Sequence, residues 1–472
     1  MYLRCPVVFG QSRPVRSLCS SSVLAFEDTI FALSSGRGPC GVAVVRVSGP
    51  DAAGALRALT SLKRTLIPRT AHLRNITHPK SNELLDRGLI LWFPGPHSFT
   101  GEDSAEFHIH GGPAVINGVL QALGSLPGLR PAEAGEFTRR AFHAGKLDLT
   151  EVEGLGDLIH AETEAQRRQA LRQMAGDLRR LYDDWSEQLK HAKCLWIGKL
   201  WCLAHMEAFI DFSENELIED GVLNQVDTAV SKLQAEIQRH LIDERRGERL
   251  RSGVQVVIAG STNAGKSSLF NLLSGTTRDV VETPLDIGGF PILVEMADLT
   301  LVVVDSTQLP QEPQMVPGFL NDYLNNVLPK EPSKDHMQQC LLILNKSDLL
   351  PNEHISILQR ALGEAFRGAS VSILSCSTRD GLAEFLKMLQ ERVKAMCADP
   401  LVGSPNLTQT RHRTNLQKSV EAMSQYYKYR DVDLALAAEG LRVGLNCLGR
   451  ITGKVATEEI LDVIFRDFCI GK

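Results

Sequence analysis

The sequence predicts a protein built from α/β and all-α domains, with one α/β domain inserted into a helical one. Three observations lead to this prediction. Residues 28–129 mix short apolar strands with a helix, residues 133–238 are helical in composition, and helical composition returns at 410–468. Between the two helical stretches, the apolar run 254–258 begins a second strand-and-helix segment. Helical stretches on both sides of an α/β segment indicate one discontinuous helical domain.

Composition and charge set the broad class of protein. The chain has 472 residues, enough for two to four domains, and its 43% apolar and 23% charged residues are ordinary for a soluble globular protein. The formal net charge of −5 provides no overall attraction to nucleic acid. Any RNA contact therefore requires local basic patches or a partner. Because no stretch reaches about eighteen uninterrupted apolar residues, we expect no membrane span.

The cysteines and the N-terminus bear on localisation. The ten cysteines form no CxxC pair and no Cys/His cluster with zinc spacing, which indicates a reducing compartment. Residues 1–26 contain Arg4, Arg13 and Arg16, several serines and no acidic residue. This composition is typical of a mitochondrial presequence and predicts localisation in the mitochondrial matrix. Two prolines weaken the amphipathic helix that a presequence forms, so a disordered N-terminus is the alternative.

The secondary structure of the first half can be read from residue patterns. Residues 41–47 and 88–93 read as strands and 114–123 as a helix, with glycine-rich turns between them. The helical stretch is clearest at 161–189, which is rich in Glu, Gln, Arg, Ala and Leu. The basic run 245–251 then precedes the second α/β segment. We interpret this run as a solvated linker, with an RNA contact as the alternative.

The strongest motif is a glycine-rich loop between a strand and a helix. Gly260-Ser-Thr-Asn-Ala-Gly265-Lys266-Ser267 fits the pattern G-x-x-x-x-G-K-[ST] and lies between the strand 254–258 and the helical residues 268–273. Its glycines let backbone N–H groups converge on phosphate oxygens, and the helix N-terminus adds the positive end of its dipole. We expect Lys266 to bridge the β- and γ-phosphates and the Ser267 hydroxyl to ligate Mg²⁺.

A second motif selects the base. Asn345-Lys346-Ser-Asp348 follows the buried strand 340–344. The Asp348 carboxylate can accept hydrogen bonds from guanine N1–H and the 2-amino group, which adenine cannot reciprocate, and buried polar pairing of this kind discriminates strongly. Ser375-Cys376-Ser377 follows the strand 371–374, where GTP-binding proteins place a backbone donor for guanine O6. In this order along the chain, the motifs predict GTP as the nucleotide.

Together with further stretches, these motifs resemble the MnmE/TrmE family of tRNA-modification GTPases, of mitochondrial type. The resemblance covers nearly all of residues 28–472. Besides the P-loop, it is carried by Asp28-Thr-Ile-Phe, Phe99-Thr-Gly-Glu-Asp103, His108-Ile-His-Gly-Gly112, Gly135-Glu-Phe-Thr-Arg-Arg-Ala-Phe142, Gly145-Lys-Leu-Asp-Leu149, Gly275-Thr276-Thr277-Arg278-Asp279 and the terminal Phe468-Cys469-Ile-Gly-Lys472.

The resemblance implies a domain order: an α/β folate-binding and dimerisation domain at 27–130, helical parts at 131–250 and 396–472, and an inserted Ras-like G domain at 251–395. It also implies an activity. With an FAD-dependent partner of the MnmG/GidA type, such proteins install a substituted methyl group at C5 of the wobble uridine. The one-carbon donor is 5-formyl- or 5,10-methylene-tetrahydrofolate. In a mitochondrial tRNA the substituent is expected to be of the taurinomethyl or carboxymethylaminomethyl type.

Site residues follow from the motifs that match. The residues expected to bind GTP are Asn263, Ala264, Gly265, Lys266, Ser267, Ser268, Thr276, Thr277, Asn345, Lys346, Asp348, Ser375 and Cys376. By resemblance, Ser267 and Thr277 hold Mg²⁺, and Asn263 is a ligand of K⁺. Folate contacts carry over to Arg46, Glu106, Lys146 and Lys472, because Arg and Lys suit the glutamate carboxylates of a folate and Glu106 suits the pterin N–H groups. Each folate residue has a surface ion pair as its alternative. Cys469 matches the C-terminal cysteine of the family, with a small buried hydrophobe as the alternative.

The chain departs from the family where hydrolysis is concerned. The family's DTAGLR stretch is absent, and four residues join the strand 290–294 to the strand 299–305. Neighbouring parallel strands need a crossover of a dozen or more residues. We therefore expect either a hairpin in an altered sheet or one of the two strands outside the sheet. The catalytic residue is unknown; Asp298 can be proposed, but we favour its interpretation as a plain turn residue.

Two other departures affect the switch region and the helical domain. Seven residues separate Ser267 from Gly275, which leaves Thr277 just able to reach the Mg²⁺ site and no slack for a loop that holds K⁺. Residues 192–201 are additional to the family pattern.

The leading hypothesis from the sequence is a folate- and GTP-dependent tRNA-modification enzyme that acts with a flavoprotein. A hydrolysis-deficient GTP-binding scaffold of the same family is the alternative. A regulatory GTPase without an RNA role is disfavoured by the N-terminal motifs and the Cys-Ile-Gly-Lys terminus, which a signalling switch does not need.

Overall fold

The computed structural model describes residues 28–36, 38–62, 67–206, 216–242, 245–274, 285–287, 290–293, 298–327, 340–365, 370–397, 399, 405, 407–455, 458–466, 468 and 470–471. The chain forms two compact units, one of residues 1–147 with 465–472 and one of residues 148–464. Among the described helices, none is long and apolar enough to cross a membrane.

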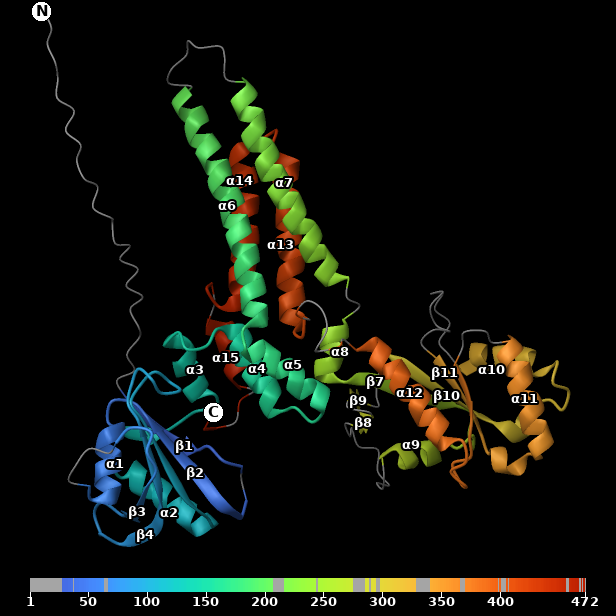
Figure 1. Ribbon diagram of the computed structural model, residues 1–472, viewed down its shortest axis with the longest axis horizontal. Coiled ribbons are helices and arrows are strands. Elements are labelled where there is room, and N and C mark those ends of the chain that lie inside the picture. Colours follow the sequence, from blue (N-terminus) through green and yellow to red (C-terminus); the bar gives the residue numbers. More distant parts are fainter. Residues whose placement is uncertain are drawn as a thin grey trace, which may run out of the picture. The chain divides into compact units, whose positions relative to one another are not determined.

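The first unit is a six-stranded sheet with two helices on one face (Figure 1). The strand order is β3-β4-β5-β2-β1-β6, and every neighbouring pair is antiparallel except β1 with β6. The strands are β1 (Thr29–Leu33), β2 (Cys40–Ser48), β3 (His72–Thr77), β4 (Leu84–Phe93), β5 (Ser104–Gly111) and β6 (Leu129–Pro131); the helices are α1 (Ala52–Thr60), α2 (Pro113–Gly124) and α3 (Glu136–His143).

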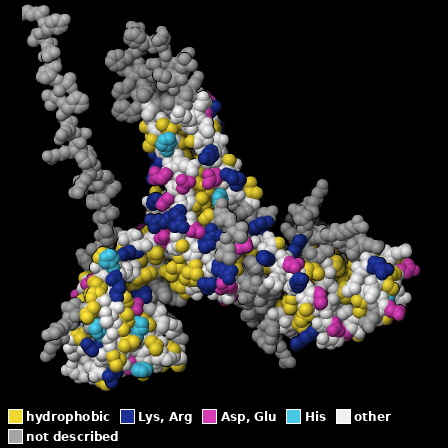
Figure 2. All heavy atoms as spheres, viewed as in Figure 1, with side chains coloured by type: hydrophobic (Ala, Val, Ile, Leu, Met, Phe, Trp, Pro, Cys, Tyr) yellow, Lys and Arg dark blue, Asp and Glu magenta, His cyan; other side chains and the backbone are white. Residues whose placement is uncertain are grey.

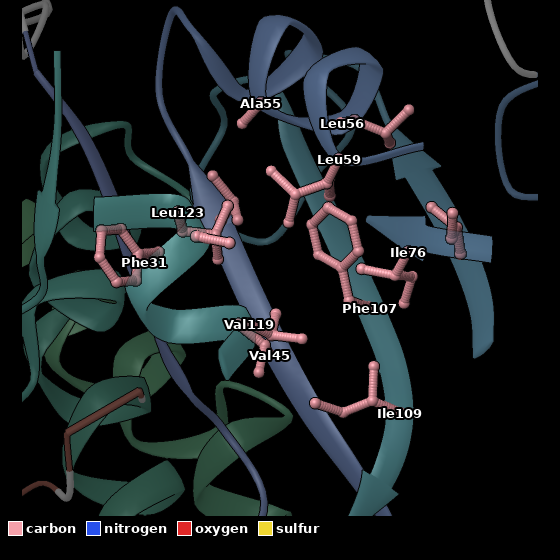
Figure 3. Close-up of a cluster of buried hydrophobic side chains, with 14 of the residues drawn as sticks. Phe31, Val45, Ala55, Leu56, Leu59, Ile76, Phe107, Ile109, Val119 and Leu123 are labelled. Atoms are coloured by element: carbon pink, nitrogen blue, oxygen red, sulfur yellow. The ribbon is translucent and has the colours of Figure 1, made fainter. Parts of the chain in front are cut away.

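Alternation along the central strands sets the two faces of this sheet. Val45 and Phe107 point toward Leu59 of α1 and Val119 of α2, in a core that Figure 3 shows between the sheet and the helices. Side chains of a strand alternate between its faces. The residues between the buried ones, Arg46 among them, therefore lie on the face opposite α1 and α2.

The first unit extends past the boundary expected at residue 130. Ala132 and Phe137 pack with Ile30 and Ala32 of β1 in a small buried cluster, so α3 belongs to the sheet domain and not to the helical one. The C-terminal segment also belongs to this unit, because Ile470 forms a bridge with Ala134. Helical composition alone does not show which core a helix joins.

The second unit contains a helical bundle built from both sides of the inserted segment. Helices α6, α7, α13 and α14 share one core, which includes Trp185, Leu233, Met423 and Leu441 (Figure 1). The helices of this part are α4 (Leu149–Ile159), α5 (Glu164–Met174), α6 (Asp177–Met206), α7 (Glu216–Leu241), α8 (Arg246–Ser252), α13 (Thr410–Tyr429), α14 (Leu434–Thr452) and α15 (Glu458–Arg466), the last of which ends in the first unit.

The segment 192–201, which was expected to be additional to the family pattern, is part of the bundle. It continues α6, and its Trp196 is buried against Tyr426 with ring centroids 5.1 Å apart. The Trp196 indole N–H donates to the carbonyl of Leu434 at 3.2 Å. The segment therefore lengthens the core at Trp196 and does not form a loop there.

The inserted segment forms a second six-stranded sheet, in the order β12-β11-β10-β7-β9-β8, that is parallel except for β8. Alternate residues of β10 are buried on both faces: Val303 packs with α9 and α12, and Val302 with α10 and α11. The elements are β7 (Val254–Gly260), α9 (Lys266–Ser274), β8 (Leu285–Ile287), β9 (Phe290–Leu293), β10 (Leu299–Asp305), a 3₁₀ turn η1 (Ser306–Gln308), α10 (Val316–Val327), β11 (Cys340–Asn345), a 3₁₀ turn η2 (Ser347–Leu349), α11 (Asn352–Ala365), β12 (Ser370–Ile373) and α12 (Leu382–Met396).

The expectation for the strands at 290–294 and 299–305 was wrong. Both β9 and β10 are in the sheet, parallel to β7 and on its two sides, so they are not neighbours. Leu293 at the end of β9 lies beside Gln255, and Leu299 at the start of β10 lies beside Val256. Because these ends are at almost the same level of the sheet, the chain needs no long return crossover between them.

Candidate nucleotide-binding site

The glycine-rich loop lies at the carboxyl end of β7 and leads into α9. Gly260 and Gly265 have φ angles of 150° and 101°, and Asn263 between them has 64°. These are left-handed values that glycine adopts without strain. At Gly265 a β-carbon would be 2.0 Å from the Asn345 side-chain nitrogen, so the loop requires glycine for a close approach as well as for its backbone angle.

The lysine of the motif forms hydrogen bonds to its own loop. The Lys266 ammonium donates to the carbonyls of Gly260 at 2.9 Å and Ser261 at 2.7 Å. Ser267 and Ser268 follow in the first turn of α9, where unpaired backbone N–H groups and the helix dipole favour an anion. A hydroxyl beside this phosphate position also suits Mg²⁺, which prefers oxygen ligands.

Asn345 joins the phosphate loop to the base-recognition segment. Its side-chain N–H₂ donates to the carbonyl of Ala264 at 2.9 Å, and its side-chain oxygen accepts from the N–H of Cys376 at 3.1 Å. The residue is buried at the end of β11. One amide therefore fixes the distance between the glycine-rich loop and the loop after β12.

The base-recognition carboxylate is oriented by a serine. The Ser375 hydroxyl donates to one Asp348 oxygen at 2.6 Å, and the same hydroxyl accepts from the N–H groups of Ser377 and Thr378. This arrangement leaves the other Asp348 oxygen for a ligand. A carboxylate held in this way is a specific acceptor for two neighbouring N–H groups, as guanine presents them.

Asp305 supports a residue of the site from outside the cavity wall, and the sequence motifs did not identify it. Its carboxylate lies 2.6 Å from the Lys346 ammonium and accepts from the N–H and hydroxyl of Thr307. Burial opposes ionisation of this carboxyl, but the hydrogen bonds from Lys346 and Thr307 outweigh it and lower its pKa. The Lys346 side chain is thereby fixed at the end of β10. An acidic residue ending a buried strand was the available signal.

These residues line one cavity of about 450 Å³. Its walls are formed by Asn263, Gly265, Lys266, Ser267, Ser268, Asn345, Lys346, Asp348, Ser375 and Cys376, all expected from the sequence, together with Leu349 and Ser377, which were not. Ala264 is not in the wall and contributes its carbonyl to Asn345. Thr276 and Thr277 lie outside the described residues.

The structure places Asp298 far from the expected phosphates, at the amino end of β7. Its N–H donates to the Gln255 carbonyl, its carboxylate accepts from the Gln255 N–H, and Arg249 pairs with it at 2.9 Å. The glycine-rich loop follows the opposite end of the same strand. Asp298 is thus a structural residue of the sheet, which agrees with the interpretation of it as a residue without a catalytic role.

The basic run 245–251 forms the helix α8 with paired side chains. Arg245 contacts Glu248, and Arg251 contacts Asp157 of α4, both at 2.7 Å. Glu248 is buried and also pairs with Arg413 of α13 at 2.8 Å. On the face shown in Figure 2, acidic and basic side chains are interspersed over the helical part. The ion pairs support neither a solvated linker nor a free basic surface for RNA.

A second group of predicted residues meets on the face of the first sheet opposite α1 and α2, where the side chains are half-buried. Arg46 of β2 and Glu106 of β5 are directly opposite each other and form an ion pair at 3.0 Å. Glu106 also lies 3.2 Å from the ring of His108. The Arg46 guanidinium stands over the rings of Phe99 and Phe137, 5.4 and 5.8 Å from their centroids. Charged and aromatic groups thus lie side by side, as a flat, acidic ligand requires.

Of the remaining predicted folate residues, the structure describes Lys146 but not Lys472. The Lys146 side chain runs beside Gly101, in the loop that also carries Phe99. The C-terminal segment returns to this unit, where the Ser34 hydroxyl donates to the carbonyl of Gly471 at 2.9 Å. Lys472 and Cys469 lie outside the described residues.

The sequence matches two family descriptions, the "MnmE helical domain" over residues 149–469 and the "GTP-binding protein TrmE N-terminus" over residues 29–146. It is similar to the "5-taurinomethyluridine-[tRNA] synthase subunit GTPB3, mitochondrial" of Danio rerio, with 65% identity over 94% of this chain and 93% of that protein. The protein of the same name from Homo sapiens is 51% identical over 94% of this chain and 93% of its own length. The "tRNA modification GTPase MnmE" of Parvibaculum lavamentivorans is 43% identical, over 94% of this chain and all of that protein.

Proposed function

The chain belongs to the MnmE family of tRNA-modification GTPases, and on that premise we propose that it forms 5-taurinomethyl-type wobble uridine in mitochondrial tRNA. It acts as the GTP-binding subunit of this reaction. The observation that carries the proposal is a single cavity in which Lys266 and Ser267 lie at one end and Asp348 at the other. A triphosphate, its Mg²⁺ on Ser267 and a guanine base match these positions chemically.

The first unit supplies the one-carbon donor site in this proposal. Arg46 and Glu106 offer a cation and an acceptor within one ion pair, and Phe99 offers a ring face beside them. A tetrahydrofolate combines carboxylates, ring N–H groups and flat rings, so its chemistry fits this set. Bound there, it supplies the one-carbon unit; the residues themselves bind and orient it. Lys146 and Lys472 complete the proposed set.

Partners and location follow from the same proposal. The chain works in the mitochondrial matrix with an FAD-dependent protein of the MnmG/GidA type, and it dimerises through its N-terminal domain. Its relatives from Danio rerio and Homo sapiens carry the word mitochondrial in their names, which supports the location. Asn263, in the wall of the cavity, is the proposed ligand of K⁺.

The proposed reaction is tested in cells that lack this chain. Mass spectrometry of nucleosides from purified mitochondrial tRNA is expected to show loss of the C5 substituent at the wobble uridine. Re-expression of the chain is expected to restore it, and re-expression of Lys266→Ala is not. Unchanged wobble uridines in the deficient cells would overturn the proposal.

A hydrolysis-deficient GTP-binding member of the family is the second candidate. The observation that favours it is the acidic content of the cavity: among the described residues that line it, Asp348 is the single carboxylate, and it belongs to the base end. Asp298 lies at the other end of β7. In the described part of the chain, no carboxylate therefore stands beside the proposed γ-phosphate to orient the attacking water.

A further inference from the structure

A tyrosine from α10 contacts the first peptide of the glycine-rich loop. The Tyr323 hydroxyl accepts from the Ser261 N–H at 2.5 Å and donates to the carbonyl of Val303 at 3.1 Å. A phenolic hydroxyl has one hydrogen to donate. That hydrogen is directed to β10, so the oxygen that faces the loop acts as an acceptor. Tyr323 is not among the residues that line the cavity.

The same peptide unit holds the lysine of the motif. The Ser261 N–H and the Gly260 carbonyl belong to one planar amide, in which the N–H and the C=O point in opposite directions. Tyr323 binds the N–H side of this amide, and the Lys266 ammonium binds its carbonyl at 2.9 Å. Because the amide is rigid, fixing its N–H also fixes the direction of the Gly260 oxygen, which is one of the two carbonyl oxygens that hold Lys266.

The tyrosine itself is firmly placed. Leu320 and Leu324 of α10 are buried against β10 and β11, and the Tyr323 ring stacks on Phe319 with centroids 6.3 Å apart. The close approach also depends on glycine. A β-carbon at Gly260 would be 2.3 Å from the Val303 oxygen and 3.4 Å from the Tyr323 hydroxyl.

We propose that Tyr323 is a positioning residue for phosphate recognition, which sets the Lys266 ammonium through the Gly260–Ser261 amide. The inference rests on the proposed binding of GTP and adds to it a residue outside the sequence motif. The hydroxyl of Tyr323 therefore affects binding of the phosphates and not binding of the base. The contacts that hold the base run through Asn345 and Ser375 on the other side of the cavity.

The test is Tyr323→Phe in the full chain, which keeps the ring and removes the hydroxyl. Competition against a fluorescent GDP gives dissociation constants for GDP, GTP and guanosine. Loss of one hydrogen bond of ordinary net strength corresponds to about three- to tenfold weaker binding. We expect that loss for GDP and GTP and none for guanosine. Equal losses for all three ligands, or no loss at all, would overturn the inference.

Ser306→Ala is the matched control, because it also removes one buried hydroxyl from this domain. The Ser306 hydroxyl donates to the Asn345 carbonyl at 2.6 Å, on the base side. In this variant the affinities for GDP and for guanosine are expected to change by the same factor. Their ratio should therefore stay at the wild-type value. A fall in this ratio as large as in Tyr323→Phe would show a general effect of lost packing. Failure of the wild-type chain to prefer guanine nucleotides would instead contradict the proposed function.

Discussion

Different side chains of the cavity are proposed to bind different parts of the nucleotide. In the proposed site, Lys266 and Ser267 bind the phosphates and Asp348 binds the base. The Asn345 amide links the two parts through its hydrogen bonds to Ala264 and Cys376. Each contact joins loops that are distant in the sequence. Changes at individual residues should therefore affect one part of the ligand at a time.

Asp348→Asn should change which base is bound. The carboxylate accepts two N–H groups of guanine, whereas an amide in its place presents both an acceptor and a donor. We expect GDP to bind at least about a hundredfold more weakly and xanthosine diphosphate, which has a carbonyl in place of the 2-amino group, to bind better than it does to the wild type. Competition titrations with both nucleotides measure this, and an unchanged preference for GDP would remove Asp348 from the base site.

Glu106→Gln tests the second group of residues. The substitution keeps the shape of the side chain but removes the charge that pairs with Arg46 and that we propose as the acceptor for the N–H groups of a pterin. We expect binding of 5-formyl-tetrahydrofolate to weaken about tenfold or more, in line with the loss of a charge-assisted hydrogen bond. Isothermal titration calorimetry gives the affinity. Because the proposed GTP-binding residues belong to the other compact unit, GDP affinity serves as the control and should not change.

Helices and strands show where patterns in the sequence were sufficient and where they were not. The glycine-rich loop and the two segments after β11 and β12 could be predicted, because each is a local motif beside a recognisable strand. Tyr323 could not, since its partner is 62 residues away and no short pattern marks it. Asp305 was marked only as an acidic residue that ends a buried strand, and its partner Lys346 is 41 residues away. The helix α3 was assigned to the wrong core because helical composition does not specify a packing partner.

The pairing of β9 and β10 was missed for another reason. Their order in the sequence suggested direct neighbours, but β7 lies between them. In the folded sheet, the registers of β9 and β10 with β7 bring the end of β9 level with the start of β10. The number of residues between β9 and β10 does not reveal this register.

Trp196→Ala should destabilise the helical bundle. Its side chain is fully buried against Tyr426, within the segment 192–201 of α6. Removing a buried aromatic ring of this size costs about 3–5 kcal/mol. The neighbouring Ile197 is exposed, and Ile197→Ala should change the free energy of unfolding by less than about 1 kcal/mol. Urea denaturation followed by circular dichroism compares the two, and equal effects would mean that the segment 192–201 does not share the core.

The helix α8 should make stability dependent on acid pH through Glu248. Burial opposes ionisation of this carboxyl, but hydrogen bonds from Arg413 and Arg245 outweigh it and lower its pKa below the ordinary 4.5. Its stabilising contribution is therefore complete above about pH 4.5 and is lost as the pH falls below that value. Glu248→Gln should cost about 1.5–3 kcal/mol at pH 7.

Urea midpoints of Glu248→Gln and the wild type, measured at pH 7 and at pH 3.5, test this dependence. The difference between the two proteins should shrink at the lower pH. A difference that stays constant between these pH values would contradict the assignment of the pKa shift.

For the chain as a whole, we expect GTP to be bound but hydrolysed slowly. The described residues assemble the binding contacts, while no acidic group among them stands at the phosphate end of the cavity. We predict a single-turnover hydrolysis rate far below that of a relative with the DTAGLR segment, with no difference between K⁺ and Na⁺ buffers. A rate equal to that of the Parvibaculum lavamentivorans relative, and stimulated by K⁺, would contradict the prediction.

The most direct test is the nucleotide preference of the purified full-length chain. Dissociation constants for GDP, GTP, ADP and ATP, obtained by competition in the presence of Mg²⁺, compare the two bases with the phosphates held the same. We predict binding of both guanine nucleotides at least about a hundredfold tighter than that of their adenine counterparts. Equal affinity for the two bases would show that this cavity does not read guanine through Asp348.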